Sequence, residues 1–198
     1  MTPCLPRSAW SIALMWLFAL GAIAHGVEPK VTDFHGNLGK LREDSTLLGK
    51  EWTDSPGLII ENVDAESKPP QTPEEKTVAD VVAALRTAGV VAAADYTYMT
   101  KKQDPAPDVI TVRVLVFSNA EAAAQWWDKK YDSQRSGQRS YRAVKGLADR
   151  AVDSTEVKKR IALVGNVLIT CSQLKGTAEY PRVIAHYVQK VASSSQAQ

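Results

Sequence analysis

The fold of this chain is restricted most by the segment 156–171, which reads EVKKRIALVGNVLITC. Its two runs of aliphatic and β-branched residues are separated by Gly165 and Asn166, two residue types that accept the positive φ of a two-residue hairpin turn. Such a short turn fixes the register, so we expect Val164 to lie opposite Val167. Because the side chains near the turn are apolar on both faces, the hairpin is predicted to be covered on both sides or to carry a partner.

Other β-rich runs add strands to this hairpin. The runs 90–99 and 109–117 are joined by a polar loop that contains prolines, and this pattern predicts a second, long-looped hairpin. A short strand is expected within 57–63, ahead of a proline-rich break that neither a strand nor a helix interior tolerates.

Three helices are predicted between and after these strands. The segment 72–89 starts with a Thr-Pro-Glu-Glu capping box, continues with apolar residues at spacings of three and four, and ends at a glycine. A second helix should begin after Ser118, which forms another capping box with Glu121. The third is expected over 180–191, with its apolar residues on one side.

This order of elements predicts an α+β fold, with a single mostly antiparallel sheet and two to three helices packed on one face. The first six elements are compatible with a ferredoxin-like βαββαβ core, to which a hairpin strand and a C-terminal helix are added. Residues 25–57 are predicted to form an irregular N-terminal segment, 58–192 a single α+β domain, and 193–198 a disordered tail.

The first residues have the layout of a secretory signal peptide. Arg7 precedes an apolar run from about Trp10 to Ile23, and a small-x-small triplet ends at Ala24. The apolar run is shorter than the roughly 20 residues that a membrane-spanning helix needs. We therefore expect cleavage after Ala24, a secreted or periplasmic protein and no membrane span after cleavage; retention of residues 1–24 as an anchor is the alternative.

The two cysteines bear on how the mature chain is stabilised. Cys4 lies in the leader, which leaves Cys171 alone. A mature chain with one cysteine has no internal disulfide, so an ordinary hydrophobic core must hold it together. A chain of this length can bury such a core within one domain.

Charge is balanced in sum and uneven along the chain. The 24 basic and 22 acidic side chains nearly cancel, and the leader removes only Arg7 from this balance, so nothing predicts specific nucleic-acid binding. Residues 28–108 carry 9 basic against 15 acidic side chains, whereas residues 109–198 carry 14 against 7. This asymmetry fits an anion-binding face, or two halves of one domain that neutralise each other.

Two adjacent tryptophans stand in the stretch SNAEAAAQWWDKKY, residues 118–131. At helical spacing Trp127 continues a stripe of alanines that ends at Tyr131, so it is predicted to be a core residue. Trp126 is turned from it by about 100° and lies on the shoulder of the same stripe. Both rings are expected to cover one edge of the core, with an aromatic binding platform at Trp126 as the alternative.

The segment 129–145 is the strongest candidate for an interaction surface, because basic residues are frequent there and apolar residues are few. Residues 132–142 are predicted to form a mobile loop. The candidate partner-binding residues are Trp126, Lys129, Lys130, Arg135, Arg139, Tyr141 and Arg142. This set suits an unknown protein or an acidic envelope component, and a merely solvated basic loop is the other interpretation.

No catalytic or cofactor motif is present. The sequence has no Gly-x-Ser-x-Gly elbow, no phosphate-binding glycine loop and no paired metal-ligand spacing. Cys171 falls in a predicted strand, which favours a buried structural thiol, and His186 falls on the polar side of the last predicted helix. We therefore assign no catalytic residue, no cofactor and no metal ligand.

Together these observations predict a secreted or periplasmic non-catalytic domain that binds a partner or envelope component through the basic 129–145 region. The alternative is a small-molecule-binding module that uses the aromatics of the sheet and helix, Tyr96, Tyr98 and Trp126. An enzyme with an unrecognised site is the least supported, because no nucleophile, base and orienting group can be named together.

The leader generates a direct prediction. The intact mass of the protein recovered from the extracytoplasmic fraction should correspond to a chain that starts at His25, because the small-x-small triplet places cleavage after Ala24. A mass that includes residues 1–24 would instead show that the leader is retained as an anchor.

Overall fold

The computed structural model describes residues 34, 36–43, 45–55, 57–65, 70–101, 106–132, 141–174 and 179–196. The predicted signal peptide 1–24 and most of the predicted loop 132–142 lie outside these residues. The strands are β1 (Trp52–Ser55), β2 (Ile59–Ile60), β3 (Val90–Thr100), β4 (Val109–Phe117), β5 (Arg142–Ala143), β6 (Arg150–Ser154), β7 (Lys159–Val164) and β8 (Val167–Gln173). The helices are α2 (Pro73–Thr87), α3 (Ala120–Trp127) and α4 (Tyr180–Gln196), with 3-10 turns at Leu38–Leu41 and Ser45–Leu47 and a π-helical turn at Asp128–Asp132.

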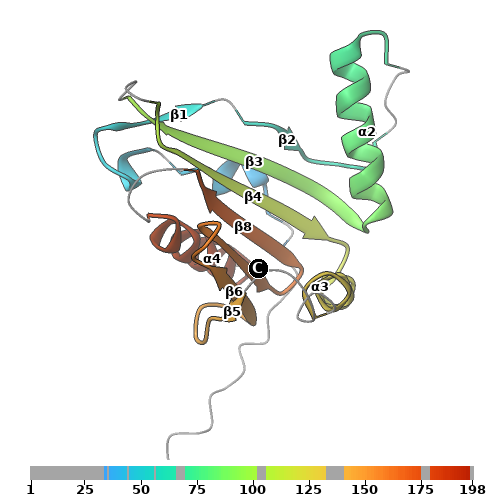
Figure 1. Ribbon diagram of the computed structural model, residues 1–198. Helices are drawn as coiled ribbons and strands as arrows, with labels where there is room; N and C mark the ends of the chain where they lie inside the picture. The colour runs from blue at the N-terminus through green and yellow to red at the C-terminus, as the bar shows by residue number, and fades with distance from the viewer. Residues whose placement is uncertain are drawn as a thin grey trace, which may run out of the picture. The chain divides into compact units, whose positions relative to one another are not determined.

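The strands form one eight-stranded sheet, which confirms the predicted α+β class (Figure 1). Its order is β1-β3-β4-β8-β7-β6-β5, and β2 pairs beside β1 on β3. All pairs among the described strands are antiparallel. A ferredoxin-like core contains a split βαβ unit and therefore needs parallel strands, so the predicted ferredoxin-like detail is not confirmed.

The helices differ from the prediction in one respect, because they pack on both faces of the sheet. On one face, alternate residues of β4 from Ile110 to Val116 share a core with α4. On the other face, Leu115 and Phe117 share a second core with Trp127 of α3 and Leu85 of α2. The period of a helix shows that one side is buried, but it does not show which face of a sheet buries it.

The predicted register of the hairpin is confirmed, and its turn also makes hydrogen bonds to a distant segment of the chain. Val164 pairs with Val167, and Gly165 adopts the positive φ of 55°. Asn166 is only 1% exposed, and its side chain bonds the backbone of a distant segment. Its Oδ1 accepts a hydrogen bond from the N–H of Phe34 at 2.6 Å, and its Nδ2 donates to the carbonyls of Phe34 at 3.2 Å and Phe117 at 2.9 Å.

The N-terminal segment is part of the core that α4 shares with the sheet. Phe34, Leu38, Leu41 and Trp52 are all buried in it. Residues 25–57 were predicted to be irregular, and the described part is short 3-10 turns followed by strand β1. The hydrophobic core therefore begins well before residue 58.

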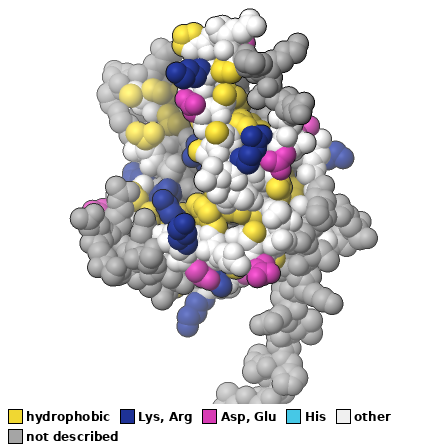
Figure 2. Space-filling view, turned by 90° about the vertical axis from the view of Figure 1, so that its right-hand side faces the viewer, with side chains coloured by type: hydrophobic (Ala, Val, Ile, Leu, Met, Phe, Trp, Pro, Cys, Tyr) yellow, Lys and Arg dark blue, Asp and Glu magenta, His cyan; other side chains and the backbone are white. Residues whose placement is uncertain are grey.

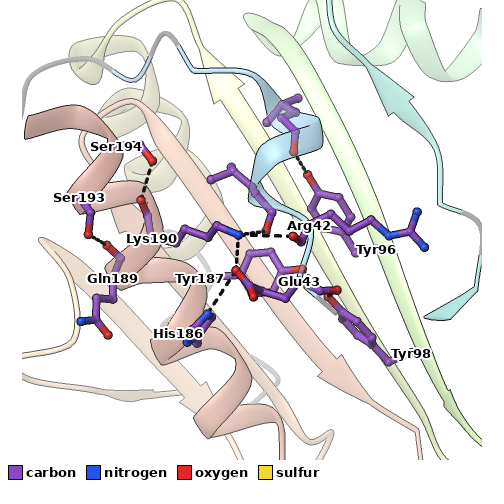
Figure 3. Close-up of polar contacts among 12 residues, drawn as sticks. Arg42, Glu43, Tyr96, Tyr98, His186, Tyr187, Gln189, Lys190, Ser193 and Ser194 are labelled. Carbon is purple, nitrogen blue, oxygen red and sulfur yellow. Dashed lines mark hydrogen bonds and ion pairs between the residues drawn. The ribbon is translucent and has the colours of Figure 1, made fainter. Parts of the chain in front are cut away.

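Buried tyrosines connect this segment to β3 and α4 (Figure 3). The hydroxyls of Tyr98 and Tyr187 lie 2.6 Å apart, and Tyr98 also donates to the carbonyl of Glu43 at 3.1 Å. The Glu43 carboxylate is bonded by Lys190 and lies 3.3 Å from Nε2 of His186. His186 and Lys190, which are one turn apart on α4, thus bind the N-terminal segment through Glu43, next to the tyrosine pair.

The C-terminal helix is longer than predicted. Residues 193–198 were expected to form a disordered tail, but α4 continues to Gln196. The hydroxyls of Ser193, Ser194 and Ser195 each donate to the carbonyl four residues earlier, which satisfies polar groups within the helix. Val191 and Ser195 are buried, so this last turn also packs against the protein.

The helices α2 and α3, which pack on the face opposite α4, both begin at an N-cap residue, as the sequence predicts. The Thr72–Glu75 capping box of α2 is present in full. The second predicted box is wrong by one residue, because Asn119 is the N-cap of α3 and accepts a hydrogen bond from the N–H of Ala122 at 2.8 Å. Asparagine and serine are about equally good N-caps, so either of these neighbouring residues suits the position.

The Asn166 contacts generate a stability prediction. Replacing Asn166 with Ala removes three buried hydrogen bonds and leaves backbone groups of Phe34 and Phe117 without them, so the free energy of unfolding should fall by about 2–4 kcal/mol. Urea denaturation followed by tryptophan fluorescence measures this loss. Asn119→Ala, which removes only an exposed cap, should cost about 1 kcal/mol. An equal loss for the two variants would contradict the structural role of Asn166.

Glu43 generates a prediction about pH. Burial, the largest single influence, acts to raise its pKa, but Lys190 and His186 together outweigh burial and hold the pKa below the ordinary 4.5. A carboxylate with a lowered folded-state pKa gives stability that is fully present above about pH 4.5 and is lost as the pH falls through the folded-state pKa. Glu43→Gln should therefore flatten the decline of unfolding free energy below pH 4.5. Glu156→Gln, a change at an exposed turn, should keep the wild-type decline.

Candidate functional site

A cavity of about 530 Å³ lies between the C-terminal end of α3 and the β5–β6 hairpin. Its lining residues are Trp127, Asp128, Tyr131, Tyr141, Ala143, Val144, Lys145, Gly146, Ala148, Asp149, Arg150, Ala151 and Val152. We call it the aromatic cavity. Its volume is in the range of small-molecule sites in proteins, about 300–1,000 Å³.

Helix α3 builds the aromatic wall. Ala123 and Trp127 are buried one turn apart on α3, and the π-helical turn that follows brings Tyr131 beneath the tryptophans. The ring centroid of Tyr131 lies 4.8 Å from that of Trp127, 5.8 Å from that of Trp126 and 6.2 Å from that of Tyr141. These separations are typical of tilted and edge-to-face aromatic contacts. The wall is therefore a connected cluster in which Tyr131 is the central ring.

Charged residues of both signs complete the cavity. Arg150 of β6 bonds the carboxylate of Asp128, which joins the two walls. Asp149 accepts a hydrogen bond from the N–H of Gly165 at 2.7 Å, and Lys145 lines the loop between β5 and β6. Burial, and to a smaller extent Tyr141, raises the pKa of Tyr131, so its phenol stays neutral and keeps its hydrogen-bonding O–H.

The predicted site residues fall into three groups around this cavity. Tyr141 lines it, and Trp126 is half-buried behind Tyr131, where it also packs on Phe117. Lys129, Lys130 and Arg142 are exposed next to it, on the π-helical turn and on β5. The remaining two, Arg135 and Arg139, lie outside the described residues.

Other functional candidates were not singled out from the sequence. Tyr131 was expected only as the end of a core stripe, although its spacing of four residues from Trp127 is the signal that puts both rings on one wall. Asp149 and Arg150 carry no local signal, because they reach the cavity through the β5–β6 hairpin and through tertiary contacts, the hydrogen bond of Asp149 with Gly165 and the pairing of Arg150 with Leu163.

The sheet tyrosines named in the small-molecule alternative lie elsewhere. Tyr96 and Tyr98 are 3% and 1% exposed and belong to the core on the α4 face, whereas Trp126 belongs to the opposite face. Their hydroxyls are bonded within the protein. These three aromatics therefore do not form one site.

Of the described residues that were considered as a nucleophile or a base, Cys171 is buried and His186 is ion-paired. Cys171 is fully buried, and burial raises the pKa of its thiol, so a reactive thiolate is disfavoured. His186 faces Glu43 on the outside of α4. Within the part of the chain that the structure describes, no group of three or more His, Cys, Asp or Glu side chains could hold a metal ion.

Comparison with known proteins gives little beyond this. No protein-family model matches the chain, and no curated protein matches it. Among solved structures, the chain is similar to the extracellular domain of PknH from Mycobacterium tuberculosis, with a TM-score of 0.46, 14% sequence identity, and coverage of 80% of this chain and 92% of that one. No helix among the described residues is both long and apolar enough to cross a membrane.

Proposed function

We propose that this chain is an extracytoplasmic, non-catalytic domain that binds an acidic envelope component. In this proposal a flat or ring-shaped apolar group of the ligand enters the aromatic cavity, and its anionic groups meet the basic residues beside it. The observation that carries the proposal is the coincidence of one cavity, an aromatic wall of contacting rings and several cations on adjacent elements.

The aromatic wall supports the apolar part of this ligand. Trp127 and Tyr131 lie on one helical segment and Tyr141 joins them in the fold, so the three rings offer a preformed surface of large apolar area. Rings held by mutual contacts lose little conformational freedom when a ligand binds.

The cations support the acidic part. Inside the cavity the charges balance, since Arg150 is paired with Asp128 and the lining also holds one further cation, Lys145, and one further carboxylate, Asp149. The exposed side chains of Lys130 and Arg142 add positive charge next to the cavity. A ligand with acidic groups outside an inserted ring matches this arrangement better than a uniformly charged polymer does.

The extracytoplasmic location rests on the sequence, namely the predicted leader ahead of His25. The absence of catalysis is supported by the engaged state of Cys171 and His186. A free small molecule of the same chemistry is the second candidate ligand, favoured by the cavity volume of about 530 Å³.

Two variants test the proposal. Tyr141→Ser removes one ring of the wall, and Lys145→Ser removes a cation of the lining; each should weaken capture by immobilised acidic envelope polysaccharide about tenfold or more. Lys76→Ser, an exposed change on α2, is the matched control and should bind as the wild type does. Equal capture of all four proteins would refute the proposal.

Native mass spectrometry of the recovered protein separates the two ligand sources. A bound species of small mass that is lost in Tyr141→Ser would assign the aromatic cavity to a free small molecule. Polysaccharide capture that depends on Tyr141, without such a species, would support the envelope component.

A further inference from the structure

A second hollow lies between α2 and the sheet, and exposed apolar side chains surround it. Its volume is about 180 Å³. It is lined by Leu58, Ile60, Val81, Leu85, Ala93, Ala94, Asp95, Arg113 and Leu115. Five large apolar side chains of the described residues are exposed, and four of them, Leu58, Ile59, Val78 and Val81, belong to α2 or the segment beside it. We call this surface the α2 groove.

The side of the molecule that carries α2 is drawn in Figure 2, where hydrophobic side chains gather in a band with charged side chains around them. Scattered single apolar residues are normal on a protein surface, but a contiguous patch marks an interaction site. The α2 groove is such a patch, because its exposed residues adjoin a hollow with an apolar lining.

The apolar side chains remain exposed because α2 is attached mainly by its last turns (Figure 1). Arg86 donates to the carbonyl of Val63 at 2.6 Å and to Asp64 at 3.2 Å, and Leu85 packs on the core below. No residue of α2 is buried. Val78 and Val81 thus extend the stripe of Leu85 at helical spacing toward the free half of the helix, where nothing in the described chain covers them.

Both signs of charge occur on this surface, with two carboxylates at the start of α2 beside the apolar stripe and Lys76 on the opposite side of the helix. Glu74 stands one turn before Val78 on the same side of α2, and Glu75 follows it in the capping box. At the floor, Arg113 bonds both oxygens of Asp95 at 2.7 Å, so this guanidinium is already neutralised. The free half of α2 therefore presents aliphatic residues bordered by carboxylates.

We propose that the α2 groove binds an amphipathic helix of a partner protein, whose aliphatic residues are flanked by lysines or arginines. The helical spacing of Val78, Val81 and Leu85 forms a ridge that suits a second helix. The hollow accepts one or two aliphatic side chains, and the carboxylates attract the flanking cations. An anionic lipid surface would be repelled by Glu74 and Glu75.

The probe for this proposal is a fluorescently labelled amphipathic helix made of leucine and lysine, titrated with the full mature chain and followed by anisotropy. Saturable binding is expected, and the double variant Val78→Ser/Val81→Ser should weaken it at least about tenfold. Glu74→Lys, which keeps the apolar stripe, should also weaken it and reduce its salt dependence. Ala83→Ser, on the opposite side of α2, is the matched control and should leave binding unchanged.

Three outcomes would overturn the proposal. The first is no saturable binding of the leucine–lysine helix. The second is a leucine–lysine helix that binds the wild type and the Val78→Ser/Val81→Ser variant equally, or a leucine–glutamate helix that binds the wild type as tightly as the leucine–lysine helix does. The third is self-association of the protein that Val78→Ser/Val81→Ser abolishes, since a second copy would then be the occupant. None of these readouts involves the aromatic cavity, so they remain separate from the test of envelope binding.

Discussion

The buried amide of Asn166 is the contact on which the relation of the N-terminal segment to the sheet depends. An amide side chain can donate and accept at once, and here it does both with the backbone of Phe34 while also bonding Phe117 of β4. Three parts of the chain meet at this one side chain without any disulfide. Because the site is closed to water, removal of the amide would leave polar backbone groups with no substitute partner.

The local parts of the fold could be predicted from sequence because short-range chemistry determines them. A two-residue Gly-Asn turn allows one register, and Thr72 with Glu75 satisfies the orphan donors at the start of a helix. The role of Asn166 could not be predicted, since its partner Phe34 is 132 residues away and nothing near the turn indicates it. The end of α4 was mispredicted because serines usually favour loops, whereas here they bond carbonyls of their own helix.

The candidate site divides in the same way. The sequence spacing indicated the aromatic wall, since Trp127 and Tyr131 stand four residues apart on a helix that has small alanines one turn earlier. The opposite wall could not be predicted, because Asp149 and Arg150 reach the cavity through the β5–β6 hairpin and its contacts with β7 and Gly165. The helix faces could be recognised from sequence, but their assignment to opposite sides of the sheet needed the tertiary structure.

The way the sheet ends has a consequence for how the protein behaves at high concentration. One border of the sheet is divided between β1 and β2, and between them Gly57 passes so close to β3 that a Cβ there would lie 1.8 Å from the carbonyl oxygen of Asp95. The other border is β5, which has two residues. The long strands β3, β4 and β8 all have neighbours on both sides. Across the described residues the sheet thus offers a second molecule only short, interrupted strand edges, a form that resists edge-to-edge aggregation.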